Sequence, residues 1–207
     1  MSDRMRLAVL VSGSGTNLQA ILDAIAAGTL KADVVVVVSN KADAYGLQRA
    51  DAIGIPTLVR ELSTANAQGM TRREYDGTLA ATLLAYSPDW VVLAGWMHLL
   101  SMDFLRHFPQ RVINLHPALP GHFPGLHAIE RGWAAYQAGD VSETGIMVHL
   151  VPDEGVDDGP VLATEIVPIL PDDTYEAYET RLHAAEHRLL VAVLRTINPL
   201  TKEVRPD

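Results

Sequence analysis

An asparagine and a histidine stand two residues apart at the end of an apolar run near the centre of the chain. Asn114 and His116 belong to the stretch RVINLH, and Pro117 follows at once. If this run is a strand, both side chains point to the same face and the proline ends the strand. A carboxamide N–H and a protonated imidazole can each donate to a developing oxyanion, as acyl transfer requires. The spacing is therefore compatible with a catalytic pair for acyl transfer.

An acidic turn later in the chain offers a carboxylate partner for this histidine. The turn reads DEGVDDG and contains Asp153, Glu154, Asp157 and Asp158. A carboxylate next to the imidazole would orient it and raise its pKa. The alternative is a strand-end histidine held by backbone carbonyls, with the acidic turn exposed to solvent.

A glycine-rich turn follows the first apolar run. The sequence SGSGTNLQA contains Gly15, Thr16 and Asn17 and leads into a helical pattern. Glycines let a ligand oxygen approach the backbone, and a helix N-terminus provides free N–H groups. The turn therefore suits a small phosphate as a ligand. A plain strand-to-helix turn without a ligand would show the same sequence pattern.

Nicotinamide and metal chemistry fit the sequence less well. Leu18 occupies the position where a dinucleotide fingerprint needs its third glycine, and the second apolar run ends in Ser39-Asn40-Lys41 rather than in an acidic residue. His116, His122 and His127 are close in sequence but are separated by prolines and glycines, in no recognised ligand spacing. We expect neither a nicotinamide nor a metal.

The elements that must position these residues alternate along the chain. Apolar runs at 6–11, 33–39, 57–60, 90–95 and 111–116 predict strands, and the segments 17–28, 44–54 and 73–89 between them predict helices. Two further strands are predicted at 143–151 and 160–169, and a final helix at about 174–196. This pattern predicts an α/β fold: an open, doubly wound, mostly parallel Rossmann-like sheet with helices on both faces and a late antiparallel strand. Ligands of such sheets bind at the carboxyl ends of the strands.

Composition limits the class of protein further. The chain has 207 residues, is 48% hydrophobic and 20% charged, and contains no cysteine. It predicts a single domain over 1–207, with a phosphate-binding half at about 1–100 and a catalytic half at about 101–207. A net charge of -9 argues against nucleic-acid and anionic-membrane partners. The lack of cysteine, of a signal peptide and of a long apolar run leads us to expect a cytoplasmic location.

Several motifs along nearly the whole chain carry a family resemblance. They are SGSGTNLQAI, VSNKADAYGLQRA, RREYD, VVLAGWMHLLS, INLHPALPGHFPGLH and VHLVPDEGVDDGPVL, together with AEH in the last helix. The N-x-H-P and D-x-G-P patterns are similar to those of the folate-dependent formyltransferase superfamily. The first loop and VSNKADA resemble its glycinamide ribonucleotide (GAR) formyltransferase branch.

The resemblance implies a formyltransferase fold and a reaction. A formyl group would pass from 10-formyltetrahydrofolate, as a co-substrate, to the amine of GAR in de novo purine biosynthesis. Both partners are small molecules and no metal takes part; a homodimer is left open.

The resemblance also implies roles for individual residues. The catalytic trio would be Asn114, His116 and Asp157, the last preferred over Asp153 because it holds the D-x-G-P position. GAR would be bound by Gly15, Thr16, Asn17, His183 and Glu186. Folate would be bound by Arg72, by the main chain of Trp96, Met97, His98, Leu99 and Leu100, and by Asn114, Val151 and Asp153. One residue more than is usual in the family separates His149 from Asp157, which predicts a bulged acidic turn.

Other functions compete with this interpretation. Methionyl-tRNA formyltransferase would need an added nucleic-acid-binding domain and formyltetrahydrofolate hydrolase a regulatory one, for which we expect no room in this chain. A non-catalytic nucleotide-binding module would need no convergence of Asn114, His116 and Asp157.

Overall fold

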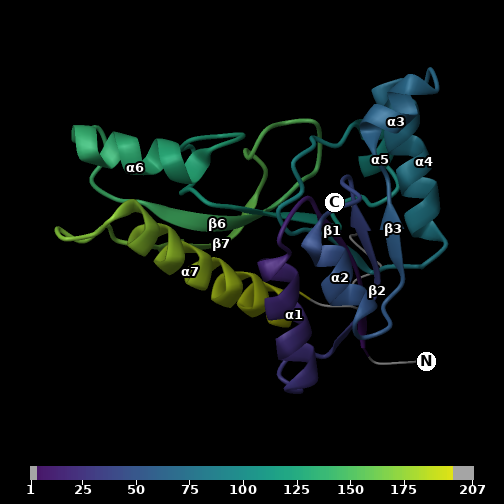
Figure 1. Cartoon of the computed structure of the whole chain (residues 1–207), viewed down its shortest axis with the longest axis horizontal. Helices are drawn as coiled ribbons and strands as arrows, with labels where there is room; N and C mark the ends of the chain where they lie inside the picture. Colours follow the sequence, from purple (N-terminus) through teal and green to yellow (C-terminus); the bar gives the residue numbers. More distant parts are fainter. Residues whose placement is uncertain (1–3, 198–207) are drawn as a thin grey trace, which may run out of the picture.

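A seven-stranded sheet forms the centre of the computed structural model, which describes residues 4–197 (Figure 1). The strands are β1 (Met5–Val11), β2 (Ala32–Ser39), β3 (Thr57–Val59), β4 (Trp90–Leu93), β5 (Val112–His116), β6 (Gly145–Leu150) and β7 (Val161–Ile166). The helices are α1 (Thr16–Ala26), α2 (Tyr45–Asp51), α3 (Leu62–Ala67), α4 (Arg72–Leu84), α5 (Met102–Leu105), α6 (Ala128–Ala138) and α7 (Tyr175–Thr196). Residues 1–3 and 198–207 of the predicted domain lie outside the described part of the chain.

The strand order is β3-β2-β1-β4-β5-β6-β7. The strands from β3 to β5 pair in parallel, whereas β6 is antiparallel to both of its neighbours. The predicted α/β class, with a late antiparallel strand, is confirmed. Because the chain order reverses between β1 and β4, the fold directs ligands to the carboxyl ends of these two strands.

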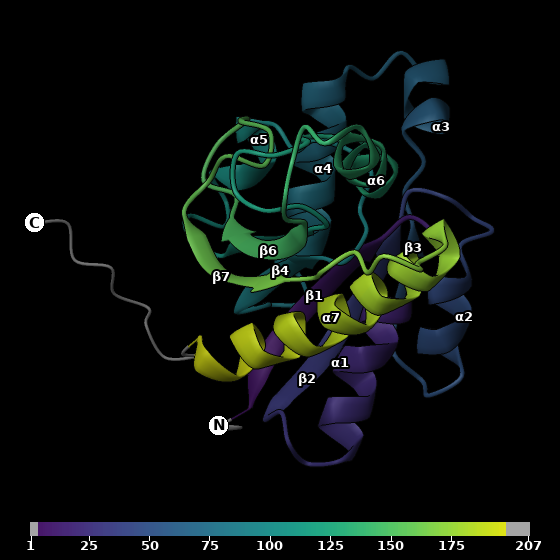
Figure 2. The same cartoon turned by 90° about the vertical axis from the view of Figure 1, so that its left-hand side faces the viewer.

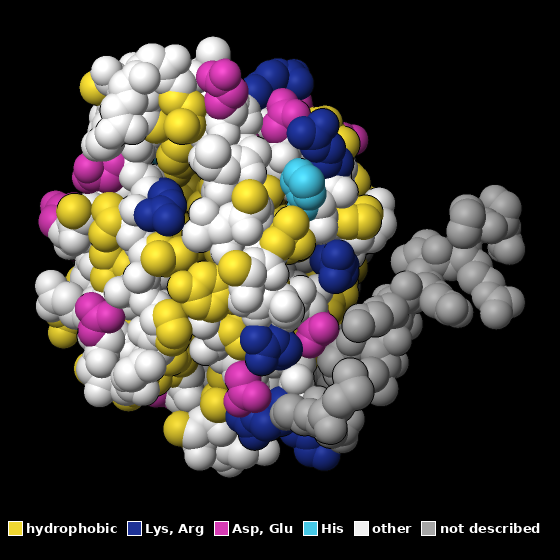
Figure 3. All heavy atoms as spheres, turned by 90° about the vertical axis from the view of Figure 1, so that its right-hand side faces the viewer, with side chains coloured by type: hydrophobic (Ala, Val, Ile, Leu, Met, Phe, Trp, Pro, Cys, Tyr) yellow, Lys and Arg dark blue, Asp and Glu magenta, His cyan; other side chains and the backbone are white. Residues whose placement is uncertain are grey.

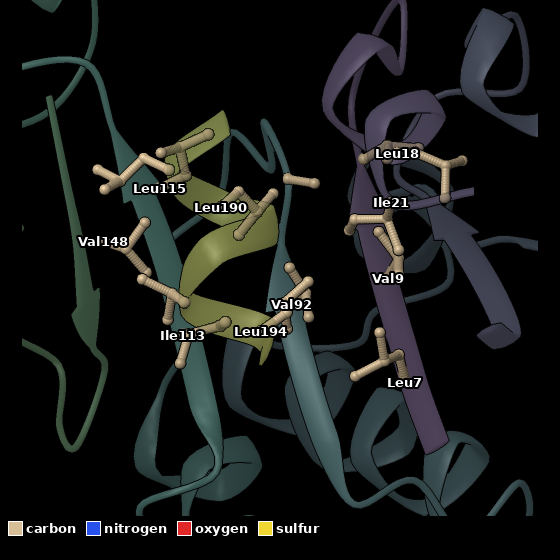
Figure 4. Packing of buried hydrophobic residues seen from close by; sticks show 14 of the residues in the cluster. Leu7, Val9, Leu18, Ile21, Val92, Ile113, Leu115, Val148, Leu190 and Leu194 are labelled. Carbon is tan, nitrogen blue, oxygen red and sulfur yellow. The ribbon is translucent and has the colours of Figure 1, made fainter. Parts of the chain in front are cut away.

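Helices cover both faces of the sheet, as predicted. Leu7 and Val9 of β1 pack against Leu18 and Ile21 of α1 on one face (Figure 4). The alternate residues of β1 pack against α4 and α5 on the other face. Strand residues that are buried on both sides explain the continuous apolar runs of the sequence.

The long helix α7 belongs to the same face as α1. Leu190 and Leu194 of α7 lie against Val92, Ile113 and Val148 of three strands (Figure 4). Figure 2 shows α7 crossing beside α1. This crossing brings the polar residues of α7 towards the turn that follows β1.

Three helices were not predicted from the sequence. Two of them, α3 and α5, are short, with six and four residues. The third, α6, follows a segment rich in proline and glycine, starts after His127 in a left-handed conformation, and ends at the left-handed Gly139. By contrast, α4 begins with a capping box between Thr71 and Glu74, a signal that is visible in the sequence.

The outer surface on the side of α3 and α4 carries mixed charge. Figure 3 shows basic and acidic side chains interspersed there rather than gathered by sign. Within residues 4–197, no helix has the length and apolarity to cross a bilayer.

Candidate active site

Asn114, His116 and Asp157 come together in the structure. The Nδ2 group of Asn114 donates to Oδ1 of Asp157 at 2.9 Å, and Nδ1 of His116 lies 3.3 Å from Oδ2 of the same carboxylate. Gly125 fixes this second oxygen through its backbone N–H at 2.8 Å. Alternation along β5 places Asn114 and His116 on one face, while Ile113 enters the core on the other.

His149 is a fourth member of this cluster that the sequence analysis did not assign to the site. It lies on β6 directly opposite Asn114 and is 2% exposed. Its Nδ1 donates to the carbonyl of Leu150 at 2.8 Å, and its Nε2 lies 3.2 Å from Asn114 Nδ2 and 3.4 Å from Asp157 Oδ1. Pairing across the strands of the sheet is the signal that would have found it.

The pKa of His116 differs from the expectation. Burial lowers it below the ordinary value, although the Asp157 carboxylate and the backbone of His122 both act to raise it. The carboxylate thus acts in the predicted direction, but burial, which the sequence does not show, has the larger effect on the pKa. The reason is that only 4% of the side chain is exposed, so desolvation of the charged ring outweighs the attraction. Its Nε2 is buried and has no hydrogen-bond partner within residues 4–197.

Asp157 remains ionised. Burial raises its pKa, but contacts with His149, the Gly125 N–H and His116 outweigh burial and bring the pKa below the ordinary value. Asp157 adopts a left-handed backbone conformation with φ 53°. The ladder between β6 and β7 also shifts register between Val148 and His149. Both features are consistent with the bulged turn predicted from its extra residue.

The glycine turn after β1 is tightly packed against α2. Gly15 has φ 68° and caps α1, and a Cβ placed there would lie 2.6 Å from Cα of Gly46. Gly46 donates to the carbonyl of Gly13, and Arg49 Nε donates to the carbonyl of Ser14. Contacts with α2 therefore hold the turn in place. The first N–H groups of α1 point away from the helix and remain available to an anion.

A carboxylate from α7 reaches this turn. Glu186 is 5% exposed, and its Oε2 lies 3.3 Å from Asn17 Nδ2 and 2.7 Å from His183 Nδ1. The hydrogen bond to Glu186 raises the pKa of His183. A histidine whose charged form is favoured thus lies beside a carboxylate next to the glycine turn.

The segment after β4 forms another wall of the site. The Met97 N–H donates to the Ser12 hydroxyl at 2.9 Å, which ties this wall to the glycine turn. Within the described part of the chain, the N–H groups of His98, Leu99 and Leu100 donate to no acceptor. The main-chain N–H groups of His98, Leu99 and Leu100 are therefore available to a ligand, whereas that of Met97 is occupied by Ser12.

A cavity of about 720 Å³ joins these parts, a volume typical of small-molecule sites. Its walls include all of the predicted residues but one: Gly15, Thr16, Asn17, Trp96, Met97, His98, Leu99, Leu100, Asn114, His116, Val151, Asp153, Asp157, His183 and Glu186. Asp153 does not reach the trio; it accepts from the N–H of Gly155.

Arg72 is the predicted residue that does not line this cavity. Its Nε lies 3.2 Å from Oδ1 of the fully buried Asp76. Lys41 and the segment 125–130 line the cavity although sequence reasoning did not assign them to it. Within residues 4–197, no cluster of three or more potential ligands is arranged to hold a metal ion.

Comparison with known proteins places the chain in a class. Residues 5–194 match the model of the family described as "Formyl transferase". The chain therefore belongs to the formyl transferase family, which confirms the predicted resemblance.

Similar proteins within this family share one name or function. Phosphoribosylglycinamide formyltransferase of Schizosaccharomyces pombe is 46% identical over 92% of this chain and 96% of its own length. The enzyme of the same name from Escherichia coli is 41% identical over 92% of this chain and 85% of its own length. The crystal structure of glycinamide ribonucleotide transformylase 1 from Symbiobacterium toebii superposes with a TM-score of 0.84 at 42% identity, covering 94% of this chain and 88% of that one.

Proposed function

We propose that this chain transfers a formyl group from 10-formyltetrahydrofolate to the amine of GAR, which is a step of de novo purine biosynthesis. The observation that carries the proposal is the convergence of Asn114, His116 and Asp157 in one cavity beside a glycine turn at a helix N-terminus. Family membership supports the formyl chemistry, and the relatives named above support GAR as the acceptor.

Asn114 and His116 would stabilise the oxyanion that forms when the amine attacks the formyl carbon. Each side chain has a donor that is directed at Asp157 in this structure, so the reacting oxygen would compete with the carboxylate for these donors. Catalytic hydrogen bonds often tighten only when substrate is present. Because burial disfavours the charged ring, His116 would donate to the oxyanion through the N–H of its neutral imidazole.

Asp157 would orient His116 and move a proton. The attacking amine nitrogen loses one proton, and N10 of the folate gains one as its bond to the formyl carbon breaks. The ionised carboxylate is placed beside the reacting groups and can accept the first proton, directly or through water.

The two substrates would occupy opposite parts of the cavity. The phosphate of GAR would bind the N–H groups around Gly15, Thr16 and Asn17, with His183 as a further cation and Glu186 facing the ribose hydroxyls. Folate would bind as a co-substrate along the other wall, where main-chain donors and the exposed apolar side chains of Met97 and Leu99 suit a flat heterocycle.

Folate would also contact the acidic loop. Val151 and Asp153 line the cavity on that side. Arg72 would meet the carboxylate tail only where the folate leaves the cavity, because Arg72 does not line the cavity.

The function is tested by adding GAR and a 10-formyl folate analogue to the protein and following release of the deformylated folate by absorbance. We expect release that depends on GAR and yields one formylated GAR per folate. Release at the same rate without GAR would indicate a hydrolase and overturn the proposal.

A further inference from the structure

The acidic loop, residues 152–159, is tied to the rest of the molecule at its tip. Oε1 of Glu154 accepts a hydrogen bond from the backbone N–H of Met102 at 2.8 Å. The same oxygen lies 3.2 Å from Nη2 of Arg73 on α4. Glu154 is absent from the cavity wall, whereas Asp153 and Gly155 on either side of it are part of that wall. Its side chain therefore reaches outward, across to α4 and the start of α5.

Two successive backbone N–H groups at the end of the folate wall are held by carboxylates from different parts of the chain. The Ser101 N–H donates to Oδ2 of the fully buried Asp76 at 2.8 Å. The next N–H, that of Met102, donates to Glu154. Asp76 belongs to a packed helix, whereas Glu154 belongs to the loop. The contact at Met102 therefore fixes the loop rather than the wall.

The loop carries Asp157 three residues beyond this contact. Its start is shaped by the hydrogen bond from Gly155 N–H to Asp153 at 2.9 Å. Its end is packed so closely that a Cβ on Gly159 would lie 2.0 Å from the carbonyl oxygen of Leu150. Between these points, Asp157 holds a left-handed conformation that other contacts must maintain.

We propose that Glu154 is a positioning residue, which clamps the acidic loop to the Met102 N–H and thereby holds Asp157 against Asn114 and His116. This inference rests on the proposed function, and it assigns to Glu154 a role apart from substrate contact.

The hydrogen bond to Met102 should outweigh the ion pair with Arg73. The side chains of Arg73 and Glu154 are 64% and 43% exposed, and pairs of this kind contribute little. A carboxylate that accepts from a backbone N–H forms a charge-assisted bond, which is the stronger kind. Glu154→Gln keeps an oxygen acceptor and should be milder than Glu154→Ala, and Arg73→Ala should be the mildest.

Met102→Pro removes the same contact from the opposite side. Met102 is the first residue of α5, a position that tolerates proline, and Ser101 before it is extended with φ -81° and ψ 168°. Met102→Pro thus deletes the donor of this hydrogen bond, and Glu154→Ala deletes its acceptor. Glu165→Gln is the matched control, because Glu165 also pairs with an exposed arginine, Arg188, but lies on β7 away from the loop.

The experiment measures kcat/KM for the folate analogue, the KM for GAR, and amide hydrogen exchange across the acidic loop. For Glu154→Ala and Met102→Pro we expect kcat/KM for folate to fall about five- to tenfold, the size of one lost hydrogen bond. We expect faster exchange in the loop, an unchanged KM for GAR, and no further loss in the double variant. Arg73→Ala should change kcat/KM by no more than about twofold.

Wild-type kinetics and exchange in Glu154→Ala would overturn the inference, and so would losses that multiply in the double variant. Failure of the wild-type protein to formylate GAR would instead overturn the proposed function. The hydrogen-exchange measurement needs no substrate, so it tests the role of Glu154 independently of the proposed function.

Discussion

Each proposed oxyanion donor can be tested by removing its side chain. Asn114→Ala and His116→Ala should each lower kcat by about 10²- to 10³-fold, or about 2.7 to 4 kcal/mol, because each deletes a donor to the tetrahedral intermediate. Steady-state kinetics of folate release give the measurement, and circular dichroism checks the fold. Asn66→Ala, which removes an exposed asparagine of α3, is the control and should keep wild-type turnover. A variant of either residue that turns over normally would contradict the assigned role.

The charge of His183 should control the affinity for GAR. Its pKa is raised by Glu186, with a smaller contribution from Glu179 in the same direction. The cation is therefore present below the ordinary pKa near 6.5 and is lost as pH rises through the higher folded value. A phosphate monoester is already close to dianionic above about pH 7, so it does not mask this change.

We expect the KM for GAR to increase with pH above neutrality in the wild-type protein and to vary less in His183→Gln. Initial rates at saturating folate, measured across the pH range, provide the check. An equal pH dependence in both proteins would show that His183 does not contact the phosphate.

At the scale of the element, the glycine turn after β1 and the start of α2 depend on each other. Gly15→Ala would place a Cβ 2.6 Å from Gly46 Cα and require φ 68° of a residue with a side chain. We expect the free energy of unfolding to fall by on the order of 1–3 kcal/mol, the range for strained backbone, and the KM for GAR to rise. Chemical denaturation and kinetics measure the two effects.

Gly77→Ala serves as the control for this substitution. Gly77 lies within α4, and the nearest atom to an added Cβ is 4.0 Å away. Alanine is favoured over glycine in helices by up to about 1 kcal/mol, so this variant should be as stable as the wild type or more stable. Equal stability of Gly15→Ala and the wild-type protein would contradict the close packing.

The strands and the shared orientation of Asn114 and His116 could be predicted because each depends on local periodicity. Burial on both faces produces continuous apolar runs, and alternation along β5 places Asn114 and His116 together. His149 could not be predicted in the same way, because its place opposite Asn114 comes from pairing with β5. The contact of Glu154 with Met102 was equally hidden, since it depends on the path of an irregular loop.

The net lowering of the pKa of His116 could not be predicted for a related reason. Sequence shows that a carboxylate is available, but it does not show how completely the ring is removed from water. Burial depends on all the segments that meet at the end of β5, including the stretch that carries His122. Helix α6 was missed because the prolines and glycines before it suggested a loop, whereas the left-handed His127 allows a helix to start directly after them.

At the scale of the whole molecule, one cavity draws on both halves of the sequence. Ser12 to Asn17 line it from the first half, and Asn114, Asp157 and Glu186 from the second. We propose that the chain unfolds as a single domain, so binding of either substrate should raise the melting temperature of one common transition. A ligand at 100 times its Kd would stabilise the protein by about 2.7 kcal/mol.

Scanning calorimetry with GAR alone and with the folate analogue alone tests this expectation. Two separate transitions, each shifted by one ligand, would show that the halves fold independently.

The reversed direction of β6 has a consequence for how this site can change over evolution. Asn114 and His149 face each other because two antiparallel strands are in one particular register. The long connection between these strands can gain or lose residues without separating Asn114 from His149. A single residue inserted within either strand would turn one partner to the opposite side of the sheet. Length variation should therefore be tolerated in the parts of this connection that do not line the cavity, and it should be selected against within the strands.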